Sequence, residues 1–182
     1  MYEQPFSFSA ELSCPLKSDI TAENGMLLVD GECPSDADTE SSSYPCNKLI
    51  YSDAPTEKGI LFRGVLKIIT DGVVKENGAA LSVDNATYAV LLFTIKTSYN
   101  GFDKHPVTEG KEYKNACIDS LNKAEQYGYD ELLKRHMADY AALYNRVSLT
   151  LSDTSELLPT DERIKHFQKT DDNGLYELLF NY

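Results

Sequence analysis

Acidic side chains are the most concentrated groups in this sequence that could do chemistry. Asp36 begins the stretch Asp-Ala-Asp-Thr-Glu, and Asp30 and Glu32 precede it. Carboxylate oxygens at this spacing can gather around Ca²⁺, but the stretch lacks the central glycine and the distal glutamate of an EF-hand loop. We therefore interpret residues 31–45 as a long, solvated acidic surface loop and predict no metal ion there.

The nucleophiles and bases of the chain do not form a recognised catalytic motif. His105, His136 and His166 are scattered, and the serine run 41–43 is not part of a G-x-S-x-G elbow. We expect His136 near the apolar face of its helix, as a hydrogen-bonded structural residue rather than a base. The glycine-rich signatures that bind phosphate are also missing from the sequence.

The cysteines are Cys14, Cys33, Cys46 and Cys117, so none forms a C-x-x-C pair, and no histidine stands at zinc-ligand spacing. We predict no metal site and no cofactor from this set. Cys14 and Cys33 each precede a proline, where turns near strand ends would allow a disulfide bridge. We favour free, half-buried thiols over a bridge. The cysteines do not indicate whether the protein belongs to an oxidising or a reducing compartment.

Four aromatic side chains, Tyr88, Tyr99, Phe102 and Tyr113, allow two interpretations. They would either form a platform on which sugar rings stack or pack within the core or against another domain. We favour packing. The polar turn over residues 97–102 carries aromatic side chains of the kind found at interfaces, so it is the expected point of contact with another domain.

Length and charge limit the classes of fold and partner. The chain has 182 residues, with 17 Lys and Arg against 29 Asp and Glu, a net charge of −12. A chain of this length buries roughly 70% of its unfolded surface, enough for one good core. The negative charge would repel nucleic acid and anionic membranes. No apolar run approaches the roughly 20 residues that span a bilayer, and residues 1–5 do not resemble a signal peptide.

Up to about residue 110 the apolar residues recur with a period near two, which is typical of strands. Asn24-Gly25 and Asn77-Gly78 are tight-hairpin signals. Residues 89–93 are apolar at both parities, which predicts a strand covered on both faces. Together the segments predict a mainly antiparallel β-sandwich. The expected strands lie at residues 5–12, 26–29, 60–70, 73–75, 80–83 and 86–95.

After residue 110 the period becomes 3.6, which predicts helices. Gly128 stands where a helix would end, and residues 147–151 alternate strictly, so we expect a strand that returns to a sheet. The last helix is apolar on most of its circumference and ends with exposed Phe180 and Tyr182. We interpret this as a truncated chain whose continuation would bury these residues, with a dimerising helix as the alternative. The expected helices lie at residues 113–127, 130–144, 159–167 and 172–182.

Several segments, taken in order, resemble glycoside hydrolase family 95, whose best-known members are α-L-fucosidases. The clearest is Leu-Pro-Thr-Asp-Glu-Arg-Ile at 158–164, followed by Leu-Tyr-Glu-Leu-Leu-Phe-Asn-Tyr at 175–182. Residues 136–151, from His-Met-Ala-Asp-Tyr to Arg-Val-Ser-Leu-Thr-Leu, resemble the helix-then-strand piece of the family. The resemblance extends to residues 62–66 and 97–106 and covers roughly residues 20–182.

The resemblance implies an α+β architecture: an N-terminal β-sandwich, a helical linker with one return strand, and a large (α/α)₆ barrel. On this basis residues 1–110 would be a partial sandwich, 111–157 the linker with its strand, and 158–182 the start of the barrel. The resemblance would then place the first strands of the sandwich before Met1 and nearly all of the barrel after Tyr182.

The resemblance also implies chemistry that this chain would lack. Family members are similar to inverting glycosidases, with a glutamate as acid and amides that help to activate water, all within the barrel. No residue here matches those motifs, so we assign no catalytic, cofactor-binding or metal-binding residue and expect the chain to be inactive alone. The expected partners are the barrel, a fucosylated glycan bound by the whole enzyme, and a second copy through open sheet edges or the last helix. A standalone carbohydrate-binding sandwich and an α-galactosidase-type relative are the alternatives.

Overall fold

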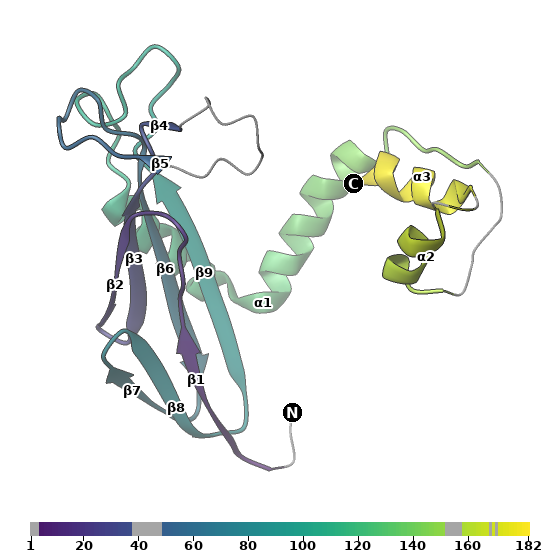
Figure 1. The fold of residues 1–182 in the computed structure, drawn as a ribbon. Coiled ribbons are helices and arrows are strands. Elements are labelled where there is room, and N and C mark those ends of the chain that lie inside the picture. Colours follow the sequence, from purple (N-terminus) through teal and green to yellow (C-terminus); the bar gives the residue numbers. More distant parts are fainter. Residues whose placement is uncertain (1–3, 38–48, 152–157, 168, 170) are drawn as a thin grey trace. The chain divides into compact units, whose positions relative to one another are not determined.

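The structure, a computed structural model, describes residues 4–37, 49–151, 158–167, 169 and 171–182 (Figure 1). Within these ranges the chain divides into two compact units, residues 1–128 and 129–182. The first unit holds the strands and the beginning of a long helix, and the second is helical. The strands end at Thr97 and the first helix begins at Lys114, which agrees with the predicted change near residue 110 from a period near two to a period of 3.6, and the α+β class is confirmed.

Antiparallel sheets form the first unit. A four-stranded sheet has the order β2-β3-β6-β9, a three-stranded sheet has the order β1-β8-β7, and β4 pairs with β5. The strands are β1 (Phe6–Glu11), β2 (Ser18–Glu23), β3 (Met26–Glu32), β4 (Asp36–Ala37), β5 (Leu49–Ile50), β6 (Leu61–Thr70), β7 (Val73–Asn77), β8 (Ala80–Ala86) and β9 (Ala89–Thr97).

Both predicted hairpins form. Glu23 pairs with Met26, and the two residues between them have positive φ, 53° at Asn24 and 71° at Gly25. That combination is the type I′ turn, whose twist matches the strands it joins. Asn77 pairs with Ala80 around Gly78, whose φ is 63°. The connection after β6 is not a hairpin, because β6 and β7 belong to different sheets and residues 71–72 carry the chain from one sheet to the other.

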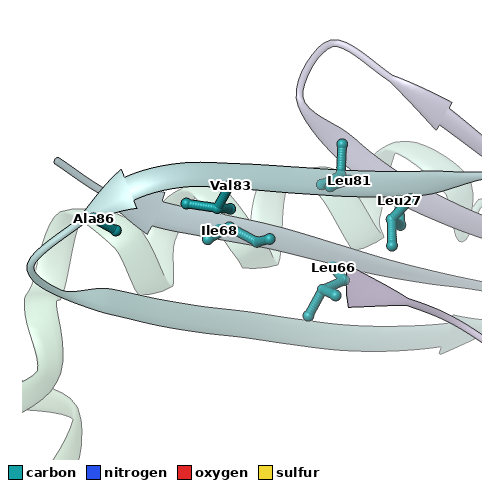
Figure 2. Packing of buried hydrophobic residues seen from close by; sticks show 6 residues of the cluster. All are labelled: Leu27, Leu66, Ile68, Leu81, Val83 and Ala86. Atoms are coloured by element: carbon teal, nitrogen blue, oxygen red, sulfur yellow. The ribbon is translucent and has the colours of Figure 1, made fainter. Parts of the chain in front are cut away.

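The core between the two larger sheets is built from alternate residues of their facing strands. Leu27 of β3 and Leu66 and Ile68 of β6 meet Leu81 and Val83 of β8 (Figure 2). These side chains are 0–6% exposed. Phe6, Phe8, Ala10 and Leu12 pack against this cluster and confirm the alternation predicted for the first strand.

A second, smaller core lies on the opposite face of the four-stranded sheet. Helix α1 (Lys114–Tyr144) begins there and places Cys117 and Leu121, 0% and 1% exposed, against Leu28 of β3 and Val65 of β6. The apolar face of the helix predicted at residues 113–127 is therefore partly buried. Gly128, with φ 70° and ψ 170°, interrupts the helix where the sequence predicts a glycine stop.

One prediction for the first unit is wrong. Residues 89–93 lie in β9, an outermost strand of its sheet rather than a strand covered on both faces. Leu92 packs toward the helix, whereas Leu91 and Phe93 are 52% and 56% exposed. Apolar residues at both odd and even positions show that both faces of the strand are apolar. Whether another layer covers each face depends on the number of strands in the opposite sheet.

The second unit contains the later part of α1 and two short helices, α2 (Thr160–Phe167) and α3 (Asn173–Asn181). Both short helices were predicted. The expected return strand is absent, because residues 147–151 are described and form no strand. A strand needs a partner for its backbone groups, and in the part of the second unit that the structure describes no sheet offers one.

Candidate functional site

A polar cluster joins the four-stranded sheet to the first turn of α1. Asp30 and Arg63 are direct neighbours on β3 and β6, so their side chains emerge side by side. Arg63 donates two hydrogen bonds to the Asp30 carboxylate, at 2.8 and 2.5 Å, and Lys114 lies 3.7 Å from it. The Arg63 hydrogen bond lowers the pKa of Asp30, which outweighs partial burial. The ionised Asp30 carboxylate is paired with two cations, and these contacts fasten the helix to the sheet.

Glu32, at the end of β3, is the most deeply buried charged residue in the described part of the chain, at 6% exposed. Its Oε2 lies 3.6 Å from both Lys17 Nζ and Lys58 Nζ, and Oε1 has no hydrogen-bond partner. Glu32 lines a pocket of about 340 Å³ together with Asp30, Tyr113, Lys114 and Lys17. Such a pocket can accept hydrogen bonds from hydroxyl groups at Glu32 and donate them from the lysines.

The structure separates the acids that the sequence grouped as a calcium-loop candidate. Asp30 binds Arg63, Glu32 faces lysines, and Asp36 Oδ1 accepts from the Ala37 backbone N–H. The other two acids of the stretch lie outside the described residues. Within the described ranges no three potential metal ligands come together.

The histidines are divided among unrelated settings. His105 Nδ1 accepts from the backbone N–H groups of Val107 and Thr108, at 3.2 and 3.4 Å, and so organises a turn in the first unit. His136 is exposed on α1 and lies against the Tyr140 ring, which corrects the prediction of a hydrogen-bonded position on a buried face. The expected burial required a covering layer, and this face of α1 has none among the described residues of its unit.

The described carboxyl groups with a resolved shift all have a lowered pKa. In Asp71 the cause is chiefly the Thr87 hydroxyl, and in Glu112 the backbone N–H of Asn115 at the start of α1. The pKa of Asp172 falls to about 2 because Arg163 binds it. A glycosidase acid must instead hold its proton near neutral pH, which requires a raised pKa. These groups are acceptors and caps rather than proton donors.

The four candidate aromatics do not share one platform. Tyr88 and Tyr99 flank opposite ends of β9, a nine-residue strand of roughly 30 Å. Tyr113 is half-buried beside the Arg63 cluster, and burial raises its pKa. Tyr88, Tyr99 and Phe102 are 45%, 46% and 96% exposed, so they are not part of the core, and their packing against another domain stays a prediction.

Phe102 stands at the tip of a loop that is fixed at its base. Ser98 is 2% exposed, its Oγ accepts from the Leu61 N–H, and its carbonyl accepts from the Lys111 N–H. Asn100 closes the loop further by donating to the Glu109 carbonyl at 2.8 Å. A large apolar side chain on a rigid support is the usual form of an interface anchor, because little entropy is lost when it binds.

The second unit presents a larger apolar surface. Arg163 of α2 donates two hydrogen bonds to Asp172, at 2.8 and 2.6 Å, and Asp172 also caps α3 by accepting from the Leu175 N–H. These contacts fix the pair of short helices around an apolar groove of about 410 Å³. Leu179 and Tyr182 are 73% and 107% exposed, so the predicted uncovered apolar end is present.

The cysteines whose positions are described are free thiols. Cys14 and Cys33 are half-buried and unbridged, as favoured from the sequence, and Cys117 is buried. Burial raises the pKa of Cys33 and of Cys117, and Cys117 Sγ contacts the Arg63 carbonyl at 3.3 Å. Cys46 lies outside the described residues. A raised pKa disfavours the reactive thiolate, so we assign these thiols no catalytic role.

No helix among the described residues is long and apolar enough to span a membrane.

Matches to known proteins cover both units of the chain. The family model described as "Glycosyl hydrolase family 95 catalytic domain" matches residues 128–182, a stretch that begins at the glycine that breaks α1. Alpha-L-fucosidase 2 of Arabidopsis thaliana is 31% identical over 187 residues, covering 97% of this chain and 22% of that protein. The chain thus spans about a fifth of the length of this curated relative.

Proposed function

Because this chain belongs to glycoside hydrolase family 95, we propose that it is the noncatalytic sandwich and linker portion of an α-L-fucosidase-like glycosidase. Its role is to brace and position a barrel that carries the chemistry. Its first unit is the brace, and residues 129–182 provide the surface on which the barrel packs. The substrate of the complete enzyme is a fucosylated glycan.

One observation carries this proposal. The first unit has its own buried core, whereas no described residue of the second unit is buried, although that unit matches the catalytic-domain family. An apolar helical surface of this extent is expected to be covered by further protein. The lowered pKa of Asp30, Asp71, Glu112 and Asp172 supports the absence of a proton donor among these groups.

Phe102 provides the second support, as a rigid anchor for contact with the barrel. The barrel of a family 95 enzyme, expressed as a separate chain, should gain fucose-releasing activity when this chain is added. Phe102→Ser should weaken that gain by about tenfold, the loss typical of an interface anchor. Val73→Ser, at a 57% exposed position on β7, is the matched control and should not change it.

Release of fucose by this chain alone would contradict the proposal. So would a barrel whose activity and stability do not respond to the added chain. Calorimetry with fucosyl oligosaccharides should show no binding at millimolar concentration.

The pocket around Glu32 favours a second candidate, a carbohydrate-binding sandwich. Glu32, two lysines and Tyr113 line it and could together bind sugar hydroxyls and a sugar face. Saturable glycan binding that is lost in Glu32→Gln, with retained fold, would support this function over the bracing role.

A further inference from the structure

Two cysteines lie at the same end of the sandwich, one from each sheet. Cys14 follows β1 of the three-stranded sheet, and Cys33 directly follows β3 of the four-stranded sheet. After Cys14 the chain crosses from the first sheet to the second, where β2 begins. The crossing ends beside Cys33, because the Glu32 N–H donates to the Lys17 carbonyl at 3.0 Å.

The side chain of Cys14 continues a row that faces the core between the sheets. The even-numbered residues from Phe6 to Leu12 pack against this core. Exposure alternates without interruption from Phe6 to Cys14, which is the next half-buried position of the row. Since alternate residues of an extended chain share a face, the Cys14 thiol is directed toward the space between the sheets.

Cys33 continues the facing row of the other sheet. Leu27 of β3 lies in the core between the sheets. The Cys33 N–H donates to the Ile60 carbonyl at 2.8 Å, which extends the β3–β6 register by one residue. Cys33 therefore keeps the alternation of β3 and shares the face of Leu27, so the two thiols point from opposite sheets toward the same region.

The electrostatics of Cys33 agree with this placement. Burial raises the pKa of the Cys33 thiol, and the next cause is negative charge on Cys14, ahead of that on the adjacent Glu32. Charge interactions weaken with distance, so a contribution larger than that of the adjacent residue requires the two sulfur atoms to lie near each other. Both thiols are free and half-buried.

The backbone around Cys14 can adjust to a bond. A disulfide requires its two Cα atoms to lie about 4.4–6.8 Å apart. Pairing of β1 with β8 ends at Glu11, and pairing of β2 with β3 begins at Ser18. Residues 12–17 can therefore move Cys14 toward Cys33 without loss of strand pairing.

We infer that Cys14 and Cys33 form a disulfide bond when the chain meets a small-molecule disulfide such as glutathione disulfide. This inference does not rest on the proposed function. The bond connects the two sheets at the end where the chain crosses between them, and it closes a loop that contains β2 and β3. Such a bond restricts the unfolded chain, so the oxidised sandwich should be more stable than the reduced one.

The bond forms by two exchange steps. One protein thiolate attacks a sulfur of glutathione disulfide, whose S–S bond breaks and releases a glutathione thiolate. The second protein thiolate then attacks the protein sulfur of this mixed disulfide and releases the second glutathione. The two protein thiols give up two electrons to glutathione disulfide, and their two protons pass to the released glutathione thiolates. Because the pKa of Cys33 is raised, the reaction should accelerate as pH rises from 7 to 9.

Mass spectrometry after oxidation tests the inference. The full chain with Cys46→Ser is incubated with glutathione disulfide, because Cys46 is a competing thiol outside the described residues. Free thiols are then blocked, and the chain is digested without reduction. We expect a peptide that links Cys14 to Cys33, and Cys117 as the blocked thiol. A chain that keeps all three thiols, stops at mixed disulfides with glutathione or links Cys117 would overturn the inference.

Thermal unfolding tests the effect of the bond on the sandwich. Oxidation of the Cys46→Ser chain should raise the midpoint of unfolding by about 5 °C or more, and dithiothreitol should reverse the change. Cys14→Ser in the same background is the matched control and should show no rise, while far-UV circular dichroism checks that both chains fold. An equal rise in the Cys14→Ser chain would assign the effect to another cysteine and contradict a bond between the sheets.

Discussion

The two units of the chain contain similar apolar side chains but bury them very differently. In the first unit, Leu27, Val65, Leu81 and Leu121 are at most 1% exposed. In the second, no described residue is buried, and Leu179 is 73% exposed. The sandwich therefore carries its own stabilising core, whereas the second unit is held by a helix cap and an ion pair and leaves its apolar surface exposed.

The sharpest test of this contrast compares one leucine from each unit. Leu121→Ala removes a side chain packed against Cys117, Leu28 and Val65 and should lower the free energy of unfolding by about 2–5 kcal/mol. Leu179→Ala should change it by less than about 0.5 kcal/mol. Urea unfolding followed by far-UV circular dichroism measures both. Equal losses at the two positions would abolish the distinction between the units.

A glycine in the sandwich tests how tightly this core is packed. A Cβ on Gly31 would lie 2.2 Å from the Phe62 ring, so Gly31→Ala should lower the free energy of unfolding by about 1–3 kcal/mol. The same urea experiment applies. The double variant with Phe62→Leu should regain part of the loss, because the smaller side chain makes room. A harmless Gly31→Ala would mean that the core is looser than its burial indicates.

The second unit should lose stability in acid, because an ion pair fixes its two short helices. The pKa of Asp172 is about 2 in the fold against an ordinary value of 3.8. A lowered pKa stabilises the fold fully above the ordinary value, and this stabilisation is lost as pH falls from about 4 through 2. The protection factor of the Leu175 amide, which corrects its exchange rate for the intrinsic dependence on pH, should therefore fall between pH 5 and pH 2, as followed by NMR.

Asp172→Asn is the control for this pH effect. Asparagine still caps a helix but cannot titrate. The protection factor of the Leu175 amide in this variant should be lower at pH 5 and should lose the step between pH 4 and 2. An unchanged step would assign the acid sensitivity to another carboxylate.

The smallest effect is expected at the exposed loop of the first unit. Phe102→Ser should leave the free energy of unfolding within about 0.5 kcal/mol of wild type, because the ring is 96% exposed. Ser98→Ala, four residues earlier, removes a buried acceptor for the Leu61 N–H and should lower it by about 1–3 kcal/mol. A destabilising Phe102→Ser would show that the ring packs against its own unit and is not free on the surface.

Local patterns predicted most of the elements. The hairpin at Asn24-Gly25 requires positive φ at both turn residues, and these residue types adopt it most readily, so the turn could be recognised without the fold. The helix break at Gly128 and the alternation of the first strand were found for similar reasons. The expected strand at residues 147–151 shows the limit, since alternation cannot supply the partner that a strand needs.

The polar cluster of Asp30, Arg63 and Lys114 could not be predicted from the sequence. Asp30 and Arg63 are separated by 33 positions, and only the β3–β6 register makes them neighbours. Glu32 was grouped with a solvated acidic loop because it precedes one. Its burial against Lys17 and Lys58 requires three segments of the chain to lie side by side in the fold, and no residue spacing in the sequence indicates that they do.

The sequence by itself determined most of the strands and helices, the hairpin turns and the family, because these depend on neighbours along the chain. The tertiary structure decided which apolar faces are covered. Leu66 and Phe93 pair directly on adjacent strands, yet one is 6% exposed and the other 56%. The difference arises because burial depends on the number and position of strands in the opposite sheet, which no local pattern records.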